Sequence, residues 1–184
     1  LPDGGAPSAA PVPAREEAPP AGDTLSRLAG NLASTDRETR LRASLKLAEL
    51  GDGRALVHLN AALDRESDPV VTASLVKAMG SCGDSTQVNR LATFLRDEDH
   101  RIRANAVKAL LLMGNRGAER VLREMLESPR EQMRLSATWV LGEVDHPQRL
   151  DWLGRLTRED PSPRVRQKAR DILAGSMGPG GLLT

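Results

Sequence analysis

The sequence predicts an all-α fold, an α-solenoid built from about five stacked helical hairpins. Five segments resemble one another at a spacing of 30 to 32 residues, and each carries apolar residues at helical spacing. Aromatic residues make up only 2% of the 184 residues and tyrosine is absent, whereas the strands of sandwiches and barrels are rich in aromatic residues. We therefore expect helices in every repeat.

The second helix of each repeat carries the strongest pattern. It opens on an apolar residue that is followed by arginine in four of the five repeats, as in LRASLKLAELG and IRANAVKALLLMG. Gly51, Gly80, Gly114 and Gly142 follow as helix ends, where a left-handed conformation costs glycine little. The predicted second helices span residues 41–51, 71–80, 102–114, 133–142 and 165–175.

A first helix precedes each of these, and a short polar turn joins the two. Apolar residues at three- and four-residue spacing predict these first helices over residues 24–32, 54–63, 86–95, 118–126 and 148–156. Because one hairpin cannot bury its apolar face alone, stacked neighbours must supply a continuous core.

The repeats account for residues 23–175, and the two ends differ in composition. Residues 1–22 are rich in alanine and proline, which predicts a disordered tether, and residues 176–184 are expected to form a flexible tail. No run of eighteen apolar residues occurs, so no membrane-spanning helix is expected. The compartment stays open: the cytoplasm is slightly favoured, and export or anchoring through the tether is the alternative.

The turns carry a second recurring pattern, an aspartate followed six residues later by an arginine. It occurs as Asp36/Arg42, Asp97/Arg103 and Asp160/Arg166, whereas repeat two has Glu66/Thr72 and repeat four has Ser128/Arg134. The pattern resembles the short HEAT-like repeats of bacteria, the class found in phycobilin lyase subunits. The resemblance implies a hydrogen-bonded ladder between adjacent turns, and we assign these residues to architecture: Asp36, Arg42, Asp97, Arg103, Arg134, Asp160 and Arg166.

Exposed positions of the second helices form the candidate binding face, because they line the concave side of such a solenoid. Cations beside a tryptophan would suit an acidic peptide or a partner helix. The alternative is a solvated face, with Trp139 packed on Trp152 in the core. The predicted partner-binding residues are Arg40, Lys77, Arg101, Lys108, Trp139 and Arg164.

No residue pattern points to catalysis, a metal or a cofactor. His58, His100 and His146 lie in different repeats without metal-ligand spacing, and Cys82 sits in a predicted loop without a neighbouring base. A single cysteine also excludes an intrachain disulfide. We therefore expect no cofactor and no enzymatic site.

The sequence favours a protein-interaction scaffold or adaptor, a monomer or part of a larger assembly, whose partner is a protein or peptide of unknown identity. A lyase- or chaperone-like accessory subunit is the alternative that the resemblance to phycobilin lyases implies. Nucleic-acid binding is a third, weaker interpretation, because 26 basic and 25 acidic residues give a net charge of only +1.

Overall fold

The computed structural model describes residues 21–175 and confirms an all-helical solenoid over them. The predicted tail lies outside the described residues, and so does the predicted tether apart from its last two residues. Those two are helical, because the first helix begins at Ala21.

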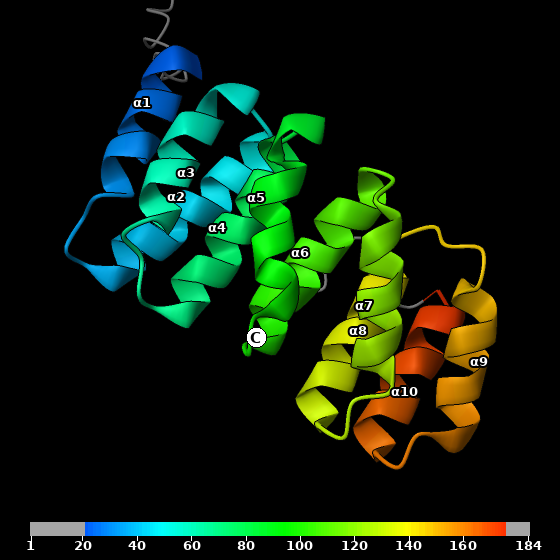
Figure 1. The fold of residues 1–184 in the computed structure, drawn as a ribbon. Coiled ribbons are helices and arrows are strands. Elements are labelled where there is room, and N and C mark those ends of the chain that lie inside the picture. The colour runs from blue at the N-terminus through cyan, green and yellow to red at the C-terminus, as the bar shows by residue number, and fades with distance from the viewer. Residues whose placement is uncertain (1–20, 176–184) are drawn as a thin grey trace, which may run out of the picture.

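Five hairpins follow one another from α1 at one end to α10 at the other (Figure 1). The third hairpin is irregular: the helix predicted over 86–95 is divided into a five-residue α-helix flanked by 3-10 turns at Ser85–Gln87 and Thr93–Arg96. A third 3-10 turn, Gly53–Ala55, leads into α3. The hairpins pair α1 (Ala21–Asn31) with α2 (Arg37–Leu50), α3 (Leu56–Leu63) with α4 (Pro69–Cys82), α5 (Val88–Ala92) with α6 (His100–Leu112), α7 (Arg116–Leu126) with α8 (Glu131–Glu143), and α9 (Arg149–Glu159) with α10 (Pro163–Leu173).

The N-caps of the second helices set the register of the repeats. These caps are Asp36, Asp68, Asp99, Arg130 and Ser162, and their spacings are 32, 31, 31 and 32 residues. The sequence alignment placed the first repeat 30 residues before the second, which is wrong by two residues. Asp36 is therefore a capping residue equivalent to Asp68, and it accepts a hydrogen bond from the backbone N–H of Thr39.

The second helices pack directly on one another, α2 on α4 and so on to α10. The contact between α4 and α6 is close at Gly80, where an added Cβ would lie 2.6 Å from the Cβ of Ala109. Gly80 and Gly142 thus lie inside helices, and only Gly51 and Gly114 of the four predicted helix ends adopt positive φ, at 59° and 73°. The sequence interpretation missed that two of these glycines serve packing.

Two apolar clusters form the core and meet at α6. One runs from α1 to α7 and receives Ile102 and Leu110 from α6, and the other runs to α10 and receives Ala104 and Val107. Successive turns of α6 therefore join the two halves of the solenoid into one body.

Candidate functional site

The turns hold a ladder of hydrogen bonds that repeats in every hairpin. Two residues before each N-cap, a side-chain oxygen accepts the backbone N–H of the capping residue at 2.8–3.2 Å. This satisfies a polar group that the helix itself leaves unpaired. The accepting side chains belong to Ser34, Glu66, Asp97, Ser128 and Asp160.

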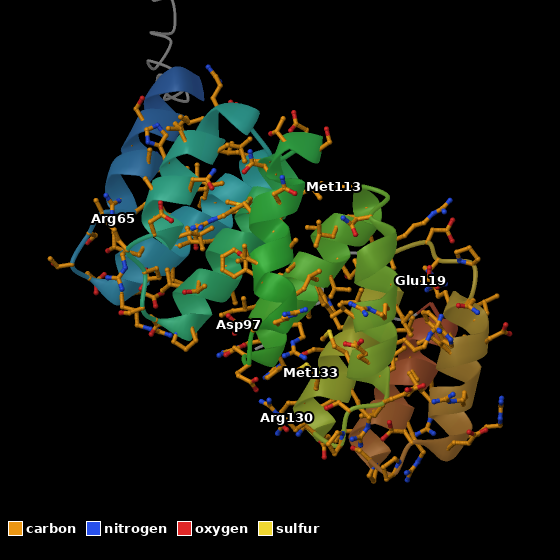
Figure 2. The ribbon with its side chains drawn as sticks, viewed as in Figure 1. Arg65, Asp97, Met113, Glu119, Arg130 and Met133 are labelled. Carbon is orange, nitrogen blue, oxygen red and sulfur yellow. The ribbon has the colours of Figure 1, made fainter. Side chains whose placement is uncertain are left out.

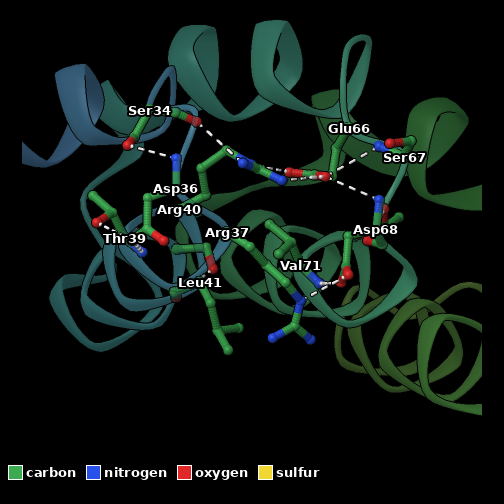
Figure 3. A network of polar contacts seen from close by, with 12 residues as sticks. Ser34, Asp36, Arg37, Thr39, Arg40, Leu41, Glu66, Ser67, Asp68 and Val71 are labelled. Atoms are coloured by element: carbon green, nitrogen blue, oxygen red, sulfur yellow. Dashed lines mark hydrogen bonds and ion pairs between the residues drawn. The ribbon is translucent and has the colours of Figure 1, made fainter.

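An arginine four residues after the N-cap completes the ladder in four repeats. Each donates to the carbonyl oxygen of the turn residue six positions earlier, at distances of 2.6–3.1 Å. In two repeats it also forms a bidentate pair with the carboxylate of the next turn. These rungs are Arg40–Glu66, drawn in Figure 3, and Arg134–Asp160. The Arg40 guanidinium lowers the pKa of Glu66 below its usual range, against the opposing effect of burial.

The ladder corrects the predicted Asp–Arg pairs. Within a repeat, Arg103 and Arg166 donate to the main-chain carbonyl groups of Asp97 and Asp160 rather than to their carboxylates. Where an arginine does bind one of these carboxylates, it comes from the preceding repeat, as Arg134 does for Asp160. Arg42 is no ladder residue: it lies two positions beyond Arg40, is exposed, and pairs with Glu38. Arg40, predicted on the binding face, is the ladder arginine of the first repeat.

The middle of the solenoid lacks two rungs, as the departures in repeats two and four suggested. Thr72 stands where the others have arginine and bonds the carbonyl of Asp68, so no guanidinium reaches Asp97. Ser128 offers a hydroxyl where Glu66 and Asp160 offer carboxylates. Figure 2 shows Asp97 and Arg130 towards the turn edge of these repeats, with Met113 and Glu119 towards the opposite edge.

The structure brings two of the predicted binding residues into contact, Lys108 of α6 and Trp139 of α8. The ammonium of Lys108 lies 5.1 Å from the centroid of the Trp139 ring, and it donates to Oε2 of Glu143 at 2.5 Å. Trp139 is 6% exposed, and its Nε1 is buried without a hydrogen-bond partner. Trp152, the alternative packing partner, stacks on His146 with ring centroids 4.8 Å apart.

Lysine, which is rare in this chain, is concentrated around the Lys108–Trp139 contact. The chain has only four lysines against 22 arginines, and Lys77 occupies in α4 the position that Lys108 occupies in α6. Lys77 forms no ion pair or hydrogen bond with any residue that the structure describes. Lys168 of α10 is half-buried, which lowers its pKa, and Asp171 and Glu143 act in the opposite direction. We call Lys77, Lys108, Trp139, Glu143 and Lys168 the lysine–tryptophan face.

Sequence reasoning missed Glu143 and Lys168. Lys168 does not recur at its position in the other repeats, and the two-residue error in the first repeat concealed that Glu49 is the equivalent of Glu143. The available signal was the rarity of lysine, because an excess of arginine leaves each lysine as a departure from the background.

The remaining predicted binding residues lie at helix N-termini. Arg101 binds the carboxylate of Asp99 at 2.6 Å and lowers the pKa of that carboxyl to about 2. Arg164 pairs with Glu131 at 3.2 Å. Arg101 precedes Lys108 by seven residues, and Arg164 lies seven positions before the residue of α10 that is equivalent to Trp139. Both therefore belong to the turn edge.

Cavities occur between the first helices of adjacent repeats, away from the lysine–tryptophan face. A cavity of about 450 Å³ lies between α7 and α9 above the Arg134–Asp160 rung, and one of about 260 Å³ lies above the Arg40–Glu66 rung. A further 260 Å³ cavity adjoins Trp152, which Arg123 also covers at 5.9 Å. The charged groups at the floors of the first two cavities are already paired within the ladder.

The histidines and the cysteine are dispersed. His100 Nδ1 lies 2.6 Å from the hydroxyl of Ser136, which is fully buried, and burial lowers the pKa of His100. Cys82 is the last residue of α4 rather than a loop residue; its thiol donates to the carbonyl of Leu47, and burial raises its pKa. Among residues 21–175, no group of three His, Cys, Asp or Glu side chains is placed to hold a metal ion. No helix in the described part is long and apolar enough to cross a membrane.

Comparisons with known proteins agree with this architecture. A family model for HEAT repeats matches residues 57–128 and 88–174. Among solved structures, the complex of CpcE and CpcF of phycocyanin lyase from Nostoc sp. PCC7120 is similar with 22% identity and a TM-score of 0.58, covering 91% of this chain and 69% of that chain.

Two engineered proteins are more distantly similar, each with a TM-score of 0.45. A designed armadillo repeat protein in complex with the peptide (KR)4 is 16% identical over 82% of this chain and 80% of that chain. Another engineered protein is 19% identical over 82% of this chain and 78% of that chain. No curated protein sequence matches the chain.

Proposed function

The chain belongs to the HEAT-repeat family, and from that premise we propose that it is a non-catalytic scaffold that binds a protein or peptide on the lysine–tryptophan face. Solenoids of this kind present extended surfaces made of equivalent positions in successive repeats. The observation that carries the proposal is the Lys108–Trp139 contact between successive second helices, with Lys77 at the same position one repeat earlier. Tryptophan is a favoured anchor of protein interfaces, and exposed lysines supply the charge that steers and orients an acidic partner.

The buried state of the nucleophiles supports a role without catalysis. The Ser136 hydroxyl is paired with His100 but fully buried, so a substrate has no access to it. The Cys82 thiol is buried, and its raised pKa disfavours the reactive thiolate.

Site-specific photo-crosslinking tests the proposed face. A benzophenone amino acid is placed at Leu112, which is 62% exposed on α6 one turn after Lys108, or at Val57, which is 67% exposed on the first helix α3. In lysate from the source cells, we expect one partner protein to crosslink from position 112 and not from position 57. Crosslinking from position 57 alone, or equally from both, would contradict the proposal.

A lyase-type accessory role is the second candidate, and the structural similarity to the phycocyanin lyase complex is the observation that favours it. Such a subunit would carry or transiently hold a tetrapyrrole. Protein purified from its source would then carry a stoichiometric amount of a chromophore that absorbs visible light, whereas a scaffold would be colourless.

A further inference from the structure

The lysine–tryptophan face contains more positive charge than its own carboxylate can pair. Glu143 bonds the ammonium of Lys108, and it lies close enough to Lys168 to act on the pKa of that ammonium. Asp171 acts on Lys168 in the same direction and more strongly, so two carboxylates face three lysines, and Lys77 has no partner among the described residues. The face therefore has room for additional carboxylates.

A second observation concerns Trp139 itself. Its Nε1–H is buried and has no acceptor among residues 21–175, although buried polar groups in native proteins are almost always paired. The side chain of Lys108, held by Glu143, lies over the indole ring. A ligand that draws Lys108 aside would uncover the ring and bring an acceptor near it.

We propose that Glu143 is an internal substitute for a carboxylate of the partner, and that an acidic peptide segment binds this face by displacing Glu143 from Lys108. The incoming carboxylates pair with Lys77, Lys108 and Lys168, and Glu143 competes with them. This proposal rests on the proposed function and names the chemistry of the partner.

The spacing of the lysines favours a peptide. Equivalent positions on packed helices are about 9–10 Å apart, and carboxylates three residues apart in an extended polyproline-type segment are about 9 Å apart. A nucleic acid requires several neutralised phosphates, whereas this face offers three lysines with Glu143 among them. An acidic peptide matches the spacing of Lys77 and Lys108, and further carboxylates along it serve Lys168, two second helices beyond Lys108.

The two tryptophans provide a built-in assay. Trp152→Phe leaves Trp139 as the single fluorophore on the proposed face, and Trp139→Phe leaves Trp152 beside His146 as the reference. The probe is an N-acetylated peptide of eight glutamates, with a peptide of eight lysines and a neutral glycine–serine peptide for comparison. We expect only the glutamate peptide to change Trp139 emission saturably, and we expect Trp152 emission to stay constant.

Three substitutions in the Trp152→Phe protein then test the displacement. Glu143→Gln removes the competing carboxylate and should tighten binding about threefold to fivefold, the equivalent of one partly exposed ion pair. Lys77→Ala should weaken binding about tenfold. The control is Arg120→Ala, because Arg120 is exposed on the first helix α7 and pairs with Glu124 of the same helix; its affinity should equal that of the parent. Circular dichroism establishes that each variant is folded.

Each contrary outcome has a distinct meaning. Unchanged or weaker binding by Glu143→Gln overturns the displacement. If the neutral peptide changes Trp139 emission as the glutamate peptide does, the face binds peptides but the acidic specificity is wrong. Tighter, Lys77-dependent binding of a twelve-base-pair DNA duplex overturns the proposal in favour of nucleic acid. Failure of every probe overturns it too, and crosslinking from position 112 then decides separately whether the proposed function stands.

Discussion

Arg134→Ala is the substitution that tests the ladder most directly. The guanidinium of Arg134 forms two hydrogen bonds with Asp160, at 2.9 and 3.1 Å, and two with the carbonyl groups of Ser128 and Pro129. The side chains of Arg134 and Asp160 are only 9% and 2% exposed. The substitution therefore leaves a buried carboxylate whose remaining hydrogen bond is the one from the backbone of Ser162.

Removing one partner of a buried ion pair costs about 3–5 kcal/mol, because the other charge stays desolvated. Two matched variants set the scale. Arg103→Ala removes one hydrogen bond to the carbonyl of Asp97 and should cost about 1 kcal/mol. Arg42→Ala removes an exposed pair with Glu38 and should cost at most about 0.5 kcal/mol.

Urea unfolding followed by circular dichroism at 222 nm measures the three losses in free energy of unfolding. We expect the order Arg134→Ala, then Arg103→Ala, then Arg42→Ala. If Arg134→Ala costs no more than Arg103→Ala, the rung to Asp160 contributes nothing, and the ladder is reduced to its bonds within each turn.

Three further predictions follow from close packing, charge and burial. Gly80→Ala should lower the free energy of unfolding by about 1–3 kcal/mol because its Cβ would meet Ala109, whereas Gly30→Ala in α1, with open space around the new Cβ, should raise it by about 0.4–1 kcal/mol in the same urea titration. Asp99→Asn keeps a capping oxygen but loses the charge. Because the pKa of Asp99 is about 2 in the folded protein and ordinarily 3.8, the stabilisation of about 2 kcal/mol is present above pH 4 and is lost as the pH falls towards 2, so stability curves of the two proteins should converge there. Cys82 should react with a thiol reagent far more slowly in the folded protein than in urea, and equal rates would contradict its burial.

The sequence predicted the hairpins because their determinants recur. Apolar spacing places each pair of helices, and the structure moves their ends by only a few residues. The register of the first repeat was wrong because Leu41 resembles the apolar residue that opens the other second helices, whereas the capping residue Asp36 determines the alignment in three dimensions. The resemblance to HEAT-like repeats implied a ladder between adjacent turns, but the partners within its rungs were not predicted. Arg134 pairs with a residue 26 positions later in the next repeat, a partner that a pattern within one repeat does not reveal.

The lysine–tryptophan face was predicted only in part, and the reason is physical. Lys108 and Trp139 lie at equivalent positions of adjacent repeats, so stacking alone places them together. Burial of Trp139 and pairing of Lys108 with Glu143 depend instead on side-chain rotamers at the end of α8, which no repeat pattern determines.

The missing rungs and the lysine–tryptophan face have a common origin in departures from the repeat. Between α4 and α6, the Arg-to-carboxylate rung is replaced by close packing at Gly80 and by a hydrogen bond from Asn105 to the carbonyl of Ala73. Small residues and a neutral amide thus hold the two helices together, and this contact needs no charged side chain from the exposed surface of either helix. Lys77 and Lys108 lie on these same two helices. Because the stacking of α4 on α6 does not depend on Lys77, which has no partner among the described residues, Lys77→Ala should leave the midpoint of urea unfolding unchanged while it weakens binding of the acidic peptide.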